Sequence, residues 1–165
     1  MLKVGLAYNM KYTEYLFSAK KHNHTCRIIK EKIDGYDEGE LETDEAKFLV
    51  LSLYYLSGYI IECSMKFKIF ELCNYDRMTE IDEVGCSKVG IDYKRHIKKH
   101  NFDILQNTLS SFIGDFPHMS KDKEVNKLIN LWNPELRYQD VKVDYNKVVR
   151  FYEHTIEFLK KMNKA

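Results

Sequence analysis

Residues 55–74 have the sequence YLSGYIIECSMKFKIFELCN, an apolar stretch that carries Glu62 and Lys66 in its middle. It belongs to a longer run, from 45 to 73, that is apolar on nearly every face of a helix. A helix that is hydrophobic all round is typical of the centre of a bundle, where neighbours cover it on several sides. We therefore predict a central helix over 45–73, in which Gly58 permits the close approach of another backbone.

The opposite charges of Glu62 and Lys66 are the unusual feature of this helix. They are spaced i, i+4 with the glutamate first, which is the favourable order for an ion pair. Their apolar neighbours predict a half-buried Glu62 that needs a donor from another helix, and a Lys66 that extends its ammonium group into water at the rim. Two interpretations stay open: a structural pair that fixes the register of the helix, or a carboxylate that orients a functional arginine or histidine.

Helical spacing of apolar residues recurs in four other parts of the chain. We predict helices over 8–33, from a cap at Asn101 to about 112, from a cap at Ser120 to Pro134, and from near Asp144 onward. No strand-like alternation is present. The sequence therefore predicts a single all-α domain over 1–165, an up-and-down bundle of four to five helices.

Two connecting segments lack this spacing. The acidic run DEGELETDE, residues 37–45, follows a helix stop at Gly35 and offers Thr43 or Asp44 as the cap of the central helix. Residues 74–100 show no sustained period, and we expect a long loop there with at most a short helical turn.

Composition narrows the class of protein. The formal net charge of +1 excludes a global basic field, so any contact with nucleic acid must come from a local patch. The longest apolar stretch before Glu62 is about fourteen residues, which is short for a membrane span of about twenty. None of the four cysteines has CxxC spacing, and His22 and His24 with Cys26 lack a fourth metal ligand. We expect a cytoplasmic protein that contacts no membrane and holds no metal or other cofactor.

The densest basic cluster is KRHIKKH, residues 94–100. Such a run can bind phosphate, or it can be a solvated loop. Within it, Arg95 can hold a phosphodiester and His100 can move a proton. Together they have the composition of a minimal metal-free RNA-cleaving pair, with the RNA 2′-hydroxyl as nucleophile.

The stretch LWNPELRYQ, residues 131–139, places Arg137 between Trp132 and Tyr138. This arginine can stack on an aromatic ring, pair with the carboxylate of Glu62, or bind a phosphate. His154, on the last predicted helix, is expected on its solvated side.

Four segments in this order resemble those of HEPN domains, which are small helical bundles. They are the amphipathic N-terminal segment, the central YLSGYIIECSMKFKI, the histidine-led KKHNFDIL and the turn LWNPELRYQ, and together they cover about residues 8–163. The resemblance implies a HEPN-like fold, a homodimer, and a polar centre made of Glu62, Lys66, His100, Arg137 and Tyr138. It also implies a possible nucleotidyltransferase-type partner, as in toxin–antitoxin or phage-defence systems.

Many HEPN proteins look like RNases with an R-x4–6-H motif before the last helix. Arg137 stands at that place, but residues 142–144 contain no histidine. Arg95 and His100 have the R-x4-H spacing, but they lie one structural element earlier in the chain than the HEPN motif does. His96 directly follows the arginine, where the HEPN motif often has a polar residue. We therefore predict a binding module, with His96 in its site, that engages a nucleotide, RNA or a nucleotidyltransferase partner as a homodimer. The alternatives are a metal-independent endoribonuclease that uses Arg95 and His100 in a dimer cleft, and a helical assembly scaffold.

Overall fold

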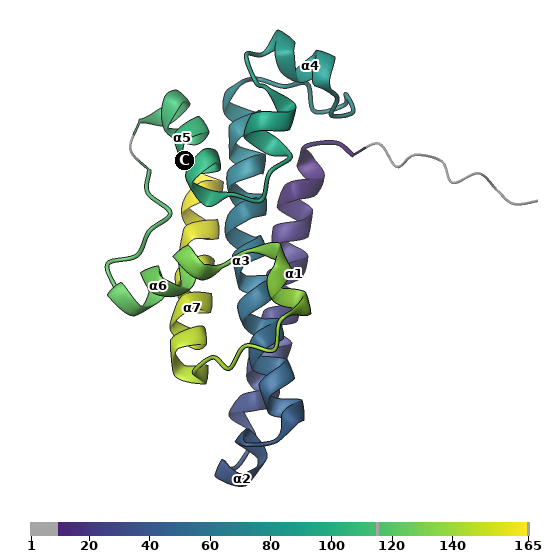
Figure 1. Ribbon diagram of the computed structural model, residues 1–165. Helices are drawn as coiled ribbons and strands as arrows, with labels where there is room; N and C mark the ends of the chain where they lie inside the picture. Colours follow the sequence, from purple (N-terminus) through teal and green to yellow (C-terminus); the bar gives the residue numbers. More distant parts are fainter. Residues whose placement is uncertain (1–9, 115, 165) are drawn as a thin grey trace, which may run out of the picture.

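The computed structural model describes residues 10–114 and 116–164, which form an all-α bundle (Figure 1). Its longer helices are α1 (Thr13–Asp34), α3 (Asp44–Leu72), α5 (Phe102–Ile113), α6 (Lys123–Leu131) and α7 (Tyr145–Lys164). Two short helices, α2 (Glu38–Leu41) and α4 (Glu83–Lys88), and two helical turns, η1 (Tyr93–Ile97) and η2 (Pro134–Tyr138), lie between them. The predicted all-α helical bundle is confirmed.

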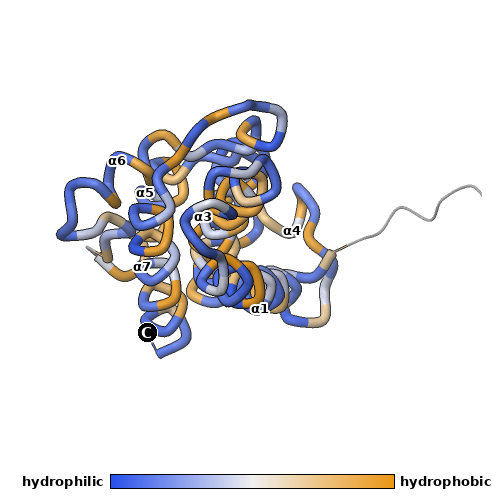
Figure 2. Tube along the Cα trace, turned by 90° about the horizontal axis from the view of Figure 1, so that it is seen from below, coloured by the Kyte–Doolittle hydropathy of each residue, from blue (hydrophilic) through white to orange (hydrophobic). Residues whose placement is uncertain are grey.

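The central helix is α3, as the sequence predicts. The Thr43 side chain caps it by accepting a hydrogen bond from the backbone N–H of Ala46. Helix α1 runs antiparallel to α3, and α7 lies on another side of it (Figure 1). Seen along the bundle, α3 lies between α1 and the group of α5, α6 and α7 (Figure 2). This encirclement explains why the sequence of α3 is apolar on every face.

Helix α3 is also the one described helix that is long and apolar enough to cross a membrane. However, 61% of its most apolar window is buried by the neighbouring helices. The core helix of a soluble protein has the same length, composition and burial, so the apolar character of α3 is accounted for by the bundle.

The segment 74–100 is more ordered than the sequence predicts. It contains α4 and the π-helical turn η1, each begun by an aspartate side chain that accepts a backbone hydrogen bond: Asp82 from Gly85, and Asp92 from Arg95. Turns this short produce no periodic pattern of apolar residues, so only their caps mark them in the sequence.

The predicted limits of α6 are wrong at both ends. Asp122, not Ser120, is the cap, because its carboxylate accepts from the backbone N–H groups of Glu124 and Val125. The helix ends at Leu131, three residues before Pro134, and this proline instead begins η2. Proline is favoured in a first helical turn, where its missing N–H costs nothing.

Gly58 has a different role from the one predicted. A Cβ atom there would lie 2.0 Å from Nε1 of the Trp132 indole, so a side chain and not a backbone approaches this glycine. The indole donates to the carbonyl oxygen of Tyr55 at 3.0 Å and stacks on Phe102 with ring centroids 4.8 Å apart. The notch at Gly58 thereby fixes the segment after α6 and the start of α5 against α3.

Candidate functional site

The two charges in the middle of α3 meet a third group from the start of α5. Lys66 Nζ lies 2.7 Å from Glu62 Oε1, and His100 Nδ1 lies 2.8 Å from Oε2 and 2.9 Å from Oε1 of the same carboxylate. Glu62 is only 2% exposed and Lys66 only 4%, whereas the His100 side chain is 44% exposed. We call these three residues the polar centre.

The sequence positions each member of the polar centre. Glu62 and Lys66 are one helical turn apart, so both side chains lie on the same face of α3. His100 directly precedes Asn101, whose side chain caps α5 by accepting from the N–H of Ile104 at 2.9 Å. Phe102 follows and is held against Trp132, so the chain directly after His100 is fixed.

The carboxylate of Glu62 is stabilised in its charged form. Burial raises the pKa of Glu62, but hydrogen bonds from His100 and Lys66, together with the charge of Lys66, outweigh burial and hold the pKa below its ordinary value. The need of Glu62 for a donor from another segment is thus met, although the side chain is fully buried and not half-buried as predicted.

The prediction for Lys66 is wrong. Its ammonium group does not reach water but stays inside the bundle, bonded to Glu62 and 5.6 Å from the centre of the Tyr15 ring on α1. Helix α1 covers this side of α3, so the lysine has no short path to the surface. A buried ammonium with one carboxylate and one aromatic ring is satisfied only while both remain in place.

The contact with Glu62 also determines how His100 is presented. A carboxylate only accepts hydrogen bonds, so Nδ1 of His100 carries a hydrogen and donates it. No described residue bonds Nε2, which is therefore open on the exposed part of the ring. The ring meets Tyr59 edge-on with centroids 6.0 Å apart.

A strip of aromatic and cationic side chains continues from Tyr59 along the surface. The Tyr55 hydroxyl donates to that of Tyr59 at 3.3 Å, and a hydrogen bond with Tyr55 raises the pKa of Arg137. The Arg137 guanidinium lies 4.6 Å from the centre of the Tyr138 ring, which is 73% exposed. We call Tyr55, Tyr59, Arg137 and Tyr138 the aromatic strip.

Arg137 therefore does not pair with Glu62, which was one of the options that the sequence left open. The carboxylate is already occupied by His100 and Lys66, and no ion pair of Arg137 is present among the described residues. The arginine instead has the stacked position, with its charge exposed to solvent at the edge of η2.

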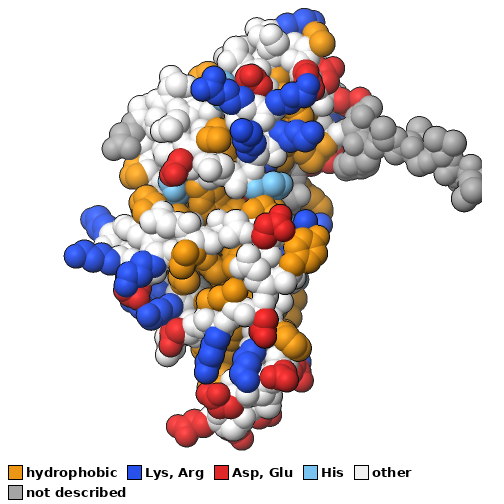
Figure 3. Space-filling view, viewed as in Figure 1, with side chains coloured by type: hydrophobic (Ala, Val, Ile, Leu, Met, Phe, Trp, Pro, Cys, Tyr) orange, Lys and Arg blue, Asp and Glu red, His pale blue; other side chains and the backbone are white. Residues whose placement is uncertain are grey.

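The basic run 94–99 begins on η1 and continues to His100. Lysine and arginine side chains gather on this part of the surface, close to histidine (Figure 3). Lys94 pairs with Glu83 on α4 at 2.9 Å, and His96 Nδ1 accepts from the backbone N–H of Asp92. Arg95 and His96 border a cleft of about 330 Å³ with α5, whereas His100 borders a different cleft with Trp132. Within one chain, Arg95 and His100 thus border separate clefts.

Two further predictions concern histidines. His154 is not on a solvated side of α7: it is half-buried, and its Nε2 donates to the carbonyl oxygen of His118 at 2.7 Å. The segment before α6 covers it, which the period of α7 alone could not reveal.

Among the described residues, no cluster of three or more histidine, cysteine or acidic side chains could hold a metal ion, and Cys26 is a buried free thiol.

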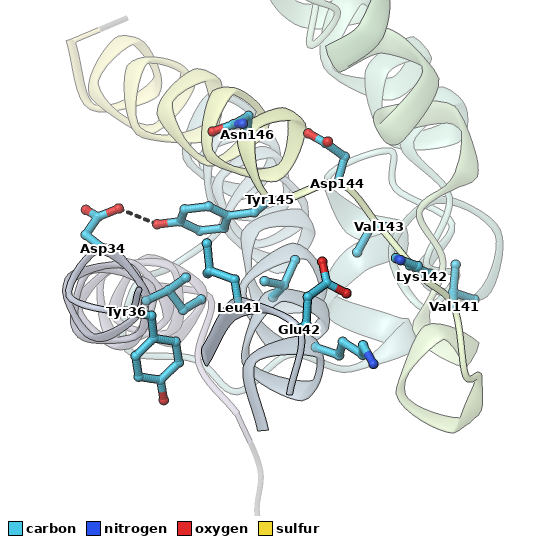
Figure 4. A pocket seen from close by; sticks show the side chains of 13 residues that line it. Asp34, Tyr36, Leu41, Glu42, Val141, Lys142, Val143, Asp144, Tyr145 and Asn146 are labelled. Carbon is cyan, nitrogen blue, oxygen red and sulfur yellow. Dashed lines mark hydrogen bonds between the residues drawn. The ribbon is translucent and has the colours of Figure 1, made fainter. Parts of the chain in front are cut away.

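A further cleft, of about 440 Å³, lies at the α2 end of the bundle and was missed from the sequence. Figure 4 shows it between the end of α1, α2 and residues 141–146, with the Tyr145 hydroxyl donating to Asp34 at one wall. Its charged side chains, among them Glu42 and Lys142, are exposed and separate from the polar centre.

Comparisons with protein-family models, with curated proteins and with solved structures find no match for this chain, so membership of the HEPN family stays a prediction from the sequence.

Proposed function

We propose that this protein is a binding module for nucleotides or RNA, and that His100 and the aromatic strip form its contact surface. One observation carries the proposal: a fully buried glutamate–lysine pair holds a half-exposed histidine whose Nε2 is open. Burying two charges costs several kcal/mol per ion, so the bond from His100 helps to satisfy the buried carboxylate, and the same bond holds the half-exposed ring in one orientation.

The chemistry around His100 suits a nucleotide. The exposed ring of Tyr138 provides a face on which a base can stack, beside the half-buried rings of Tyr55 and Tyr59, and such stacking tolerates any base. The guanidinium of Arg137 can bind a phosphate with two parallel hydrogen bonds, and the basic run on η1 adds further positive charge. Since the net charge of the chain is only +1, this local gathering is the feature that supports phosphate binding.

The proposal includes a homodimer and, as the HEPN resemblance implies, a nucleotidyltransferase-type partner. Large apolar side chains are exposed along α1 and α3, namely Phe17 at 67%, Ile28 at 50% and Phe48 at 64%. Their burial against a second subunit would remove apolar area from water. Light scattering after size exclusion, with Phe17→Ser as the dissociating variant, tests the dimer.

A metal-independent endoribonuclease is the second candidate, because one observation favours it. The bond from Nδ1 to a carboxylate orients His100 and leaves Nε2 available to take a proton from a 2′-hydroxyl. Arg95 and His100 of one chain border different clefts. In this candidate, Arg95 of one subunit therefore acts together with His100 of a second subunit on the same RNA.

The test measures fluorescence anisotropy of labelled RNA and of nucleotides with the wild type and three variants. We expect His100→Ala and Arg137→Ala each to weaken binding about tenfold, as for loss of a hydrogen bond to a charged group. Arg27→Ala is the matched control, because this arginine is exposed on α1 and its side chain bonds Glu31 and His24 of the same helix. Equal binding by all four proteins, or no binding by any, would refute the proposal.

The same RNA distinguishes the two candidates. A nuclease shortens it in the presence of EDTA, and His100→Ala abolishes the shortening without changing the circular dichroism spectrum. A binding module leaves the RNA intact at every protein concentration at which it binds.

A further inference from the structure

Beside His100, a small cleft opens between α5 and the segment that follows α6. Its volume is about 180 Å³, and it is bordered by residues 100–103, 129–130 and 132–133 together with His118. This is below the 300–1,000 Å³ of pockets for whole drug-sized ligands, so the cleft suits one flat ring system. The stacked rings of Phe102 and Trp132 form its apolar wall.

His118 presents a hydrogen-bond acceptor to this cleft. Its Nδ1 lies 3.0 Å from Oε1 of Gln106, and the amide nitrogen of Gln106 donates to Phe116 and Ser110, which fixes the amide orientation. Nδ1 of His118 is therefore the donor, and Nε2 is left as the acceptor. Burial lowers the pKa of His118, so the ring is held in this neutral form.

Nε2 of His118 is open to solvent through the cleft. His118 is 4% exposed and no described residue bonds this nitrogen. However, among the described residues no buried side-chain nitrogen or oxygen lacks a hydrogen-bond partner. Nε2 must then retain some contact with water, and the cleft is where His118 reaches the surface.

Five other polar side chains border the cleft, namely those of His100, Asn101, Asp103, Asn130 and Asn133. The oxygen of Asn101 is used as the cap of α5, so its amide nitrogen remains as a donor. The carboxylate of Asp103 has no ion pair among the described residues and is a second acceptor. The amide oxygen of Asn133 accepts from the backbone N–H of Glu135, and its amide nitrogen donates one of its two hydrogens to the carbonyl oxygen of Leu131, which leaves one donor. The cleft is thus bordered by the imidazole acceptor of His118 and by the amide donor of Asn101.

We infer that this cleft binds an unpaired base that has an amino group beside an unprotonated ring nitrogen, that is, adenine or cytosine. The amino group donates to Nε2 of His118, and the ring nitrogen accepts from Asn101. Uracil and guanine present the reverse pattern, a carbonyl beside a ring N–H, and leave the buried acceptor facing a carbonyl oxygen. This inference rests on the proposed nucleotide-binding function and adds base selectivity to it.

Trp132 provides the assay, because it is the single tryptophan of the chain and borders the cleft. We expect AMP and CMP to change its fluorescence and to bind at least tenfold more tightly than GMP and UMP. In the His118→Phe variant this preference falls to less than threefold, whereas His24→Ala, a change at an exposed histidine of α1, retains it. Short oligoadenylate and AMP compared at equal base concentration show whether the source of the base is RNA or a free nucleotide.

A second measurement does not depend on the folding of a core variant. In wild-type protein with ¹⁵N-labelled histidine, AMP should shift the Nε2 resonance of His118 and UMP should not. Binding of all four nucleotides with equal affinity, or binding that leaves both Trp132 fluorescence and the His118 resonance unchanged, overturns the selectivity while the proposed function stands. Absence of binding by every nucleotide and by RNA overturns both.

Discussion

Replacing Glu62 by glutamine perturbs the polar centre with the smallest change of shape. Glutamine has nearly the volume of glutamate, so no cavity forms, but the negative charge is lost. Lys66 is 4% exposed, and Glu62 is its ion-pair partner among the described residues. The ammonium group would then remain inside the bundle, faced only by an amide oxygen and the ring of Tyr15.

The expected cost follows from that burial. Removing one partner of a buried ion pair destabilises a protein by about 3–5 kcal/mol, because the remaining charge is uncompensated. The amide of glutamine keeps one acceptor, so we expect the lower limit, about 3 kcal/mol, for Glu62→Gln. In a chain of 165 residues this corresponds to a melting temperature lowered by roughly 6–12 °C.

Substituting both Glu62 and Lys66 isolates the electrostatic contribution to the loss of stability. Lys66→Met leaves Glu62 with His100 as its remaining donor and should cost about 1–2 kcal/mol. Glu62→Gln combined with Lys66→Met removes both buried charges and should cost no more than Glu62→Gln alone, since no uncompensated ammonium group remains inside the bundle. The two changes are then strongly non-additive.

Urea unfolding followed by circular dichroism at 222 nm measures these free energies. The matched control is Glu157→Gln with Lys160→Met, a pair on α7 whose side chains are 61% and 62% exposed. Each control substitution should change the free energy of unfolding by less than about 0.5 kcal/mol. The reasoning is refuted if Glu62→Gln costs no more than Glu157→Gln, or if the costs of Glu62→Gln and Lys66→Met simply add.

Three further outcomes follow from the fold. Gly58→Ala should destabilise by about 1–3 kcal/mol and red-shift Trp132 emission, because the new methyl group overlaps the indole; unchanged emission would contradict this. Tyr54→Phe should cost about 1 kcal/mol in urea unfolding, because its buried hydroxyl donates at 2.6 Å to a backbone carbonyl of α6, and a cost near zero would show that water replaces it. Burial lowers the pKa of both His118 and His154 below the ordinary value, so the unfolded chain binds more protons than the folded chain as the pH falls. The urea concentration at which half of the protein is unfolded should therefore be lower at pH 5.5 than at pH 7.5, and an equal or higher concentration at pH 5.5 would be the contrary result.

The sequence predicts α3 well because the pattern that identifies it is local. Every face of residues 45–73 is apolar, and that property requires burial whatever the neighbours are. The sequence predicts Asn101 as a cap, and Thr43 as one of two candidates with Asp44, for the same reason, since a cap acts within its own helical turn. The limits of α6 were missed because Ser120 and Asp122 are both good caps, and the choice between them depends on packing.

The contacts of the polar centre also differ in how far the sequence predicts them. Burial of Glu62 and its need for a donor follow from its neighbours in the sequence, and the structure supplies His100. Whether Lys66 reaches water depends on how α1 covers α3, and whether Arg137 reaches Glu62 depends on where η2 lies. Both are contacts between distant segments, and one sequence without relatives contains no local signal for them.

The location of the site follows from the spacing along a single helix. Gly58, Glu62 and Lys66 are spaced four residues apart, so they lie on one face of α3. Gly58 admits the indole of Trp132 and Glu62 binds the imidazole of His100, which places these two rings on successive turns and opens the cleft between their segments. The notch and the buried carboxylate therefore act together: a side chain at Gly58 that displaces the indole should also alter the cleft beside His100, although it touches neither His100 nor Glu62. Loss of nucleotide selectivity in Gly58→Ala, with the His100–Glu62 contact intact by NMR, would show this coupling directly, and unchanged selectivity would show that the two turns act independently.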